Sequence, residues 1–308
     1  MSMKKKDLAQ KQRKSKVLTL KKLYAPNGKE CDGYVPELKD NLFCWGGDGK
    51  EGLDGKEGLT AKQKEQFEKG AGGELNWKVK WTPPKMQSVL SSSALAVNFF
   101  AYLQATKHKT IDFWNALFFK EEEFLTGKVE EASFEKKLRI TGVRGTPPNL
   151  DFFISDTNGD MIGIESKFTE PLDRKSKNKK PIQKAYFKTP FLDENKNKKA
   201  FELAQSINNG SYQYLDAAQL LKHWLGLMSQ RNSAPKKARL IYIYHSCASG
   251  KHKEELDRFT SEAPKAGINF VHYSYNEMIA RLESCYNAQD PDDTKHLEYL
   301  RKRYYYTP

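Results

Sequence analysis

The chain has 308 residues, of which 38% are hydrophobic and 30% are charged. This length and composition exclude a wholly disordered chain and allow one large domain or two ordinary ones. The formal net charge of +13 indicates a polyanionic partner, nucleic acid before an anionic membrane surface. No apolar stretch reaches the roughly 20 residues of a membrane helix, so we expect no membrane partner. The four cysteines form no C-x-x-C pair and predict free thiols in a reducing cytoplasm, with a bacterial host expected.

The N-terminal part of the chain predicts little regular structure. Residues 1–22 carry nine Lys or Arg and one Asp, so we expect residues 1–23 to be a flexible basic arm. Residues 24–74 are rich in glycine and charge and contain the hexapeptide DGKEGL twice in tandem, which is typical of a loop. An ordered domain is expected over residues 75–308, with a basic loop at 171–200.

Helical and strand patterns then follow in chain order. A helix with serine caps is expected at 91–104 and a second helix at 114–127. The expected strands and later helices are, in order, strands 134–143, 150–155 and 161–168, a helix at 212–229 capped by Ser211, a strand at 239–246, a helix at 251–262, a strand at 268–274, and helices at 276–287 and 292–305. Three successive strands favour an antiparallel meander, and the long helix before the next strand favours a crossover. The fold class is therefore α/β, with a mixed central sheet of about four or five strands flanked by helices.

The second and third strands form a hairpin with charges in an apolar setting. An Asn-Gly pair in the turn is a strong hairpin signal, and a three-residue loop at 157–159 would place Asp151 directly opposite Glu165. Alternation adds Lys167 to the face of Glu165. We expect the other face of the first of these strands to carry Leu150, Phe152 and Ile154. A two-residue loop would shift the register by one and separate the two acids.

Two carboxylates among apolar neighbours repel each other, and one is pushed toward protonation unless a cation lies between them. Either Lys167 alone is that cation or a metal ion is. We expect the Lys167 ammonium to reach past the pair, which favours a divalent ion with hard oxygen ligands, such as Mg²⁺. Water on the ion would then be a potential nucleophile for a phosphorus atom, with the amine of Lys167 orienting it. Because burial can lower a lysine pKa, Lys167 is also a candidate for proton transfer.

The segment containing Pro148, Asp151 and Glu165-Ser166-Lys167 resembles the signature of the PD-(D/E)xK nuclease superfamily. The series SSSALAVNFF, FEKKL, PPNLD, IESKFTE and QLLKHWLGL is similar to an uncharacterised group within it described as restriction endonucleases, over roughly residues 75–306. The resemblance implies a restriction-endonuclease-like core of order αβββαβ and Mg²⁺-dependent cleavage of phosphodiesters, with Mn²⁺ as a substitute. Two departures are that Pro148 stands three residues before Asp151 and that the first helix lacks a glutamate.

By the same resemblance, Asp151 and Glu165 would hold the metal, the Ser166 main-chain carbonyl would add a ligand, and Lys167 would be catalytic. Glu74 or Glu135 could replace the missing helix glutamate. Gln219 is a further candidate, because the superfamily often aims a polar residue of its helix at the site. The lone histidines His223, His245 and His272 are expected to be structural.

The basic block after Lys167 is the expected nucleic-acid contact, through phosphate oxygens rather than base edges. Its candidate residues are Arg174, Lys175, Lys177, Lys179, Lys180 and Lys184. The leading hypothesis is a Mg²⁺-dependent nuclease that acts on double-stranded DNA, in restriction or defence against foreign DNA, with a homodimer as a possible state. The alternatives are a nucleic-acid-binding protein of the same fold without activity, and a nuclease directed at RNA or single strands.

Overall fold

The computed structural model describes residues 4–14, 34–45, 57–69, 74–76, 83–106, 108–120, 122–175, 181–230 and 237–307. Its α-helices are α1 (Lys5–Lys14), α2 (Ala61–Lys69), α3 (Ser92–Ala105), α4 (Ile111–Phe119), α5 (Lys198–Asn208), α6 (Ala217–Ser229), α7 (Gly250–Glu262), α8 (Tyr275–Cys285) and α9 (Pro291–Tyr304). Its strands are β1 (Val129–Lys137), β2 (Asn149–Asp156), β3 (Met161–Lys167), β4 (Ala238–Tyr244) and β5 (Phe270–Ser274). None of the described helices is long and apolar enough to cross a membrane.

The five strands form one mixed sheet in the order β1-β2-β3-β4-β5. The pairs β1/β2 and β2/β3 are antiparallel, as expected for strands joined by short turns. The pairs β3/β4 and β4/β5 are parallel, because α6 and α7 carry the chain back before each later strand. The predicted α/β class, the meander and the crossover are confirmed.

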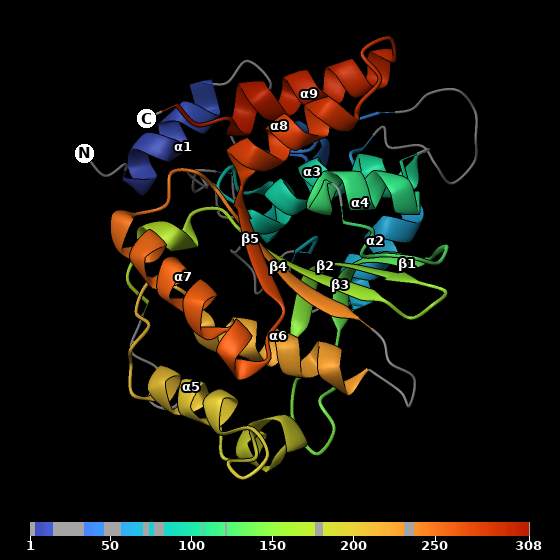
Figure 1. Ribbon diagram of the computed structural model, residues 1–308. Helices are drawn as coiled ribbons and strands as arrows, with labels where there is room; N and C mark the ends of the chain where they lie inside the picture. The colour runs from blue at the N-terminus through green and yellow to red at the C-terminus, as the bar shows by residue number, and fades with distance from the viewer. Residues whose placement is uncertain are drawn as a thin grey trace.

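Helices cover both faces of the sheet, and each face has its own apolar core (Figure 1). Helices α3, α4, α8 and α9 pack on one face, together with Phe152, Ile154, Ile162 and Ile164 of the hairpin. Helices α5, α6 and α7 pack on the other face, which includes Leu150, Phe153 and Met161. Strand β3 is buried in both cores, so any charged side chain near its end needs partners of its own.

Several element boundaries differ from the sequence prediction for local reasons. Ser91 caps α3 as expected, since its hydroxyl accepts from the backbone N–H of Ala94 at 3.0 Å. Helix α4 ends at Phe119, because Lys120 has a positive φ of 57°. Helix α6 is capped by Asp216 rather than Ser211, since the residues before it donate their N–H groups to the Glu255 carboxylate.

The flexible-arm prediction is wrong for residues 5–14, which form helix α1. Leu8 is fully buried, and Gln12 donates to the main-chain carbonyl of Arg303 at 2.7 Å, near the end of α9. Burial of these two side chains fixes the helix against the C-terminal segment, although most of its other residues are charged. The remainder of the predicted arm, and much of the glycine-rich region, lies outside the described residues.

Candidate functional site

The hairpin has the predicted register. Strands β2 and β3 pair from Ser155↔Met161 to Phe152↔Ile164, and the backbone N–H of Asp156 donates to the carbonyl of Asp160 across a three-residue loop. Gly159 has a φ of 79°, a conformation that glycine adopts without steric cost at the end of such a loop. The next positions along the register are therefore Asp151 on β2 and Glu165 on β3.

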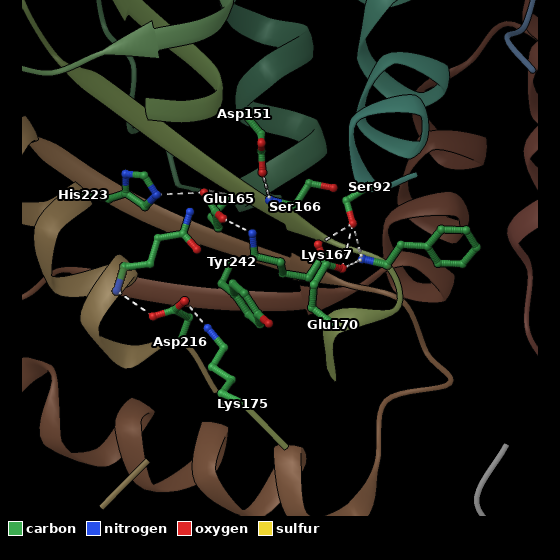
Figure 2. A network of polar contacts seen from close by, with 12 residues as sticks. Ser92, Asp151, Glu165, Ser166, Lys167, Glu170, Lys175, Asp216, His223 and Tyr242 are labelled. Atoms are coloured by element: carbon green, nitrogen blue, oxygen red, sulfur yellow. Dashed lines mark hydrogen bonds and ion pairs between the residues drawn. The ribbon is translucent and has the colours of Figure 1, made fainter. Parts of the chain in front are cut away.

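The backbone ladder ends at this level, and the Asp151 side chain takes over. Its Oδ2 atom accepts from the backbone N–H of Ser166 at 2.7 Å, where a paired strand would offer a carbonyl oxygen. Asp151 itself is half-buried. The two strands thus separate at their charged end, and a carboxylate lies in the opening between them (Figure 2).

A backbone irregularity lies on the neighbouring strand β1 at the same level. The β1/β2 register runs through Phe134↔Phe152 and Lys136↔Leu150, which places Glu135 opposite Asp151. Glu135 has a φ of 53°, which is uncommon for a residue with a side chain. The expected alternation is wrong for Leu150, which packs in the α6 core with Phe153. Strain of this kind gathers at functional sites.

Glu165 lies between two nitrogen-bearing side chains (Figure 2). The residue is 1% exposed, its Oε1 atom contacts Nζ of Lys167, and its Oε2 atom lies 2.8 Å from Nε2 of His223 on α6. Burial alone would raise the pKa of the Glu165 carboxyl, but Lys167 and His223 outweigh burial and lower the pKa to about 2. Glu165 is therefore ionised at every physiological pH.

Lys167 does not reach past the carboxylate pair as expected, because it contacts Glu165 directly. Burial lowers the pKa of Lys167, but the carboxylates of Glu165 and Asp151 outweigh it and hold the pKa well above its ordinary value. The expected fall of the lysine pKa is wrong in this arrangement. Lys167 is a fixed cation, suited to stabilising negative charge rather than to exchanging protons.

The pKa of the Asp151 carboxyl is shifted in the opposite direction to that of Glu165. Burial and then the Glu165 carboxylate raise the pKa of Asp151 well above its ordinary value, although Lys167 and the Ser166 N–H oppose this. This is the direction expected for one acid of a repelling pair. A further cation beside Asp151 would offset the repulsion from Glu165 and favour the ionised form of Asp151.

The donor set fits a hard divalent ion. Among the described residues no three His, Cys, Asp or Glu side chains gather as a metal cluster, so a metal would rest on two carboxylates and main-chain or water oxygens. Both carboxylate oxygens of Glu165 are buried without a well-aligned hydrogen bond from the described residues. The Ser166 hydroxyl points away, 2.7 Å from the Tyr275 hydroxyl, which leaves only its main chain for this role.

A second charged group lies beside Asp151, and the sequence reasoning missed its lysine. Nζ of Lys85 lies 2.8 Å from Oε1 of Glu74, whose side chain is largely buried. The hydrogen bond to Glu74 is the main reason that the pKa of Lys85 is raised, with Glu135 and Asp151 adding to it. Glu135 also accepts a hydrogen bond from Asn149. Both acids considered as substitutes for a helix glutamate therefore belong to the electrostatic surroundings of Asp151.

Helix α6 supplies His223, which the sequence had marked as structural. Gln219 stands one turn before His223, and is half-buried with its backbone N–H on the Asp216 cap. The spacing of four residues puts both side chains on the helix face that turns toward Glu165. The sequence signal was this i, i+4 pair of polar residues in a helix that is apolar apart from Lys222 and its last residue, Ser229.

The turn after Lys167 is anchored to α3. The Ser92 hydroxyl donates to the Glu170 carboxylate at 2.7–2.8 Å and accepts from the backbone N–H of Phe168 at 3.1 Å (Figure 2). The backbone N–H of His245 donates to the Lys167 carbonyl at 2.9 Å. The end of β3 is thus held from both sides.

The candidate nucleic-acid residues are only partly described. Lys177, Lys179 and Lys180 lie outside the described residues. Lys175 forms an ion pair with Asp216, the cap of α6, so the basic block meets the helix that carries His223. Arg174 and Lys184 are exposed.

Comparison with known proteins identifies a family for the chain but does not test the site residues. A family model described as restriction endonuclease associating with ARP matches residues 52–305. No curated protein and no solved structure matches the chain. The chain belongs to this family of restriction-endonuclease-like proteins.

Proposed function

We propose that the protein is a Mg²⁺-dependent nuclease that hydrolyses phosphodiester bonds in DNA, in restriction or defence against foreign DNA. The family match supports nuclease character in general. The observation that carries the finer proposal is the end of the hairpin, where the carboxyls of Asp151 and Glu165 lie with the cation of Lys167. The pKa of Asp151 is raised there, while that of Glu165 is lowered. A purely structural ion pair would not need the second acid.

Each residue has a distinct task in this proposal. Asp151 and Glu165 hold the metal, with the main-chain carbonyl of Ser166 as a further ligand. The bound ion would supply Lewis-acid activation of the phosphodiester and of water. Lys167 stabilises the charge that builds up on the phosphoryl oxygens, since its ammonium is held protonated.

His223 and the basic block complete the site. His223 keeps Oε2 of Glu165 in place. The Lys167 ammonium, which contacts Oε1, can turn from this oxygen toward the phosphoryl oxygens of the substrate. Arg174 and Lys175 lie along the chain that leaves the site and would bind backbone phosphates without reading the sequence.

The test is a cleavage assay on supercoiled plasmid, linear duplex, single-stranded DNA and RNA, each with Mg²⁺ and with EDTA. Cutting of DNA that requires Mg²⁺ and is lost in Asp151→Ala supports the proposal. Metal-dependent cutting of RNA alone would replace DNA as the substrate. Binding of nucleic acid without metal-dependent cutting of any substrate would favour the inactive binding protein.

A further inference from the structure

A cavity of about 480 Å³ lies between the loop that joins β1 to β2 and the short 3-10 helix Tyr186–Lys188. Arg139, Arg144 and Pro147 line it from the loop, and Tyr186 lines it from the other side. This volume lies within the range of pockets that hold small organic ligands. We call this cavity the loop pocket.

The two arginines of the loop pocket have no acidic partner among the residues that the structure describes. Arg139 and Arg144 are exposed, and neither guanidinium forms an ion pair or hydrogen bond within the described part of the chain. Many other cations of the described residues are paired, as Arg301 is with Glu283 and Lys175 is with Asp216. Two unpaired guanidiniums on one loop are suited to a phosphate group, which they can bind with paired hydrogen bonds.

The rest of the loop pocket is suited to a flat, partly apolar group. Tyr186 is 7% exposed, and its hydroxyl makes no hydrogen bond to the described residues. Pro147, Pro148 and the buried Ile140 add apolar wall, and Thr141 and Thr146 add hydroxyls. The ring of Tyr186 packs in the core, with Nζ of Lys222 5.5 Å from its centroid, so its part in the loop pocket is the hydroxyl, which can bond to a polar edge of a nucleobase held against the apolar walls.

The loop pocket lies close to the candidate active site. The backbone N–H of Leu138 donates to the Pro148 carbonyl at 2.9 Å and closes the base of the loop. Pro148 stands three residues before Asp151, a distance of about 10 Å along an extended strand. The loop also contacts α6, since the Gln230 side chain donates to the Arg139 carbonyl at 3.1 Å. The loop therefore meets the same helix that holds Glu165 through His223.

We propose that the loop pocket receives one nucleotide unit of the nucleic-acid substrate, unstacked from its neighbours, beside the phosphodiester that is cut. This inference rests on the nuclease function proposed above and extends it to substrate form. Arg139 and Arg144 bind the phosphate of that unit, the prolines contact its base, and the Tyr186 hydroxyl bonds to a polar edge of that base. Extruding a base from a paired duplex costs its pairing and stacking energy, and an unpaired base lowers that cost. The protein therefore favours substrates with an unpaired nucleotide near the cut.

The experiment compares two labelled duplexes of the same sequence, one fully paired and one with a single unpaired nucleotide, by fluorescence anisotropy in EDTA. The variant is Arg139→Ala/Arg144→Ala, and the charge-matched control is Lys295→Ala/Arg301→Ala on α9, on the other face of the sheet. We expect wild type to bind the duplex with the unpaired nucleotide more tightly. We expect the loop variant to lose about tenfold in affinity for that duplex, far less for the paired one, and the control to retain the preference.

Tyr186→Phe is the second variant, which removes one hydroxyl and leaves the ring. We expect it to weaken the preference for the unpaired nucleotide without lowering the melting temperature. If the arginine variant loses the same affinity for both duplexes, the loop is only a general phosphate contact and the proposal is wrong. Unchanged binding of both duplexes would also overturn it.

A competition arm separates the two sources of the ligand. If free deoxynucleoside monophosphate saturates the loop pocket while oligonucleotide binding is unchanged, the pocket belongs to a soluble nucleotide and the proposal is wrong. All binding steps are made in EDTA and do not depend on cleavage. Suppose wild type cuts no substrate, but the arginine variant still loses affinity only for the duplex with the unpaired nucleotide. The nucleotide site would then stand, and only the proposed nuclease function would be wrong.

Discussion

Two of the regions that bury carboxylates surround them with different partners. On the α3 and α9 side of the sheet, the fully buried Asp293 carboxylate accepts from the Tyr102 hydroxyl at 2.7 Å and lies 2.6 Å from Nε2 of His108. At the open end of the hairpin, Asp151 and Glu165 share one lysine, and burial and repulsion raise the pKa of Asp151. The first carboxylate has hydrogen-bonding partners on several sides, while at the hairpin end the pKa of Asp151 stays raised despite the nearby Lys167.

The difference shows how stability and function are divided in the chain. The Asp293 region joins helix α9 to α3 through hydrogen bonds between residues far apart in the sequence, so we expect it to serve stability. The hairpin end combines repelling carboxylates with a positive φ at Glu135 and a ladder that stops early. Proteins keep such costs where a ligand or a reaction uses them.

The largest expected effect is on catalysis. Lys167→Ala removes the cation that stabilises the phosphoryl oxygens, and we expect it to lower the cleavage rate by about 10²–10³-fold. Single-turnover cleavage of labelled duplex measures this, with Lys302→Ala on α9 as the control. A Lys167→Ala protein that cuts DNA at the wild-type rate would contradict the assignment of the hairpin end.

Substitution in the other region should affect folding instead. Asp293→Asn replaces the carboxylate that faces the Tyr102 hydroxyl and the His108 imidazole with a neutral amide, which is a weaker acceptor. We expect it to lower the free energy of unfolding by about 3 kcal/mol. Urea unfolding measures the loss, and cleavage assayed well below the melting temperature should stay at the wild-type rate. Lost cleavage in a protein that remains folded would mean that the two regions are not separate.

His223 should have an intermediate effect. Because it holds one oxygen of Glu165, we expect His223→Ala to weaken Mn²⁺ binding by about 10–100-fold and His223→Gln to recover part of the affinity. Titration calorimetry without nucleic acid measures the affinity. His296→Gln is the control, since His296 is equally buried but bonds to the Asn98 carbonyl. Similar losses in His223→Ala and His296→Gln would show a general packing effect.

The last prediction concerns acid stability. Burial lowers the pKa of His245, His252 and His296 to about 4 in each case. In the unfolded chain these imidazoles take a proton near pH 6.5. Their contribution is therefore fully present above about pH 6.5 and is lost as the pH falls from there toward about 4. Urea unfolding between about pH 7.5 and about pH 5 measures it, and a rise in stability on acidification would contradict the burial of these histidines.

Much of the fold and the candidate site follows from short-range pattern. The Asn-Gly turn and period-two alternation predict the register that brings Asp151 to the level of Glu165, and strand order predicts the mixed sheet. Other features depend on contacts that local pattern does not contain. The approach of His223 to Glu165 depends on the packing of α6 on β3, and the approach of Lys85 to Glu74 joins residues eleven positions apart in the sequence. The φ of Glu135 results from tertiary constraint, and helix α1 forms because Leu8 and Gln12 find partners near the C-terminus.

The central claim is that the hairpin end is an ion-binding site while the Asp293 region is not. Titration of Mn²⁺ into wild type, Glu165→Gln and Asp293→Asn, with folding checked by circular dichroism, tests it most directly. We expect Mn²⁺ binding in wild type and Asp293→Asn, and its loss in Glu165→Gln. Equal Mn²⁺ binding by folded Glu165→Gln and wild type would contradict the claim.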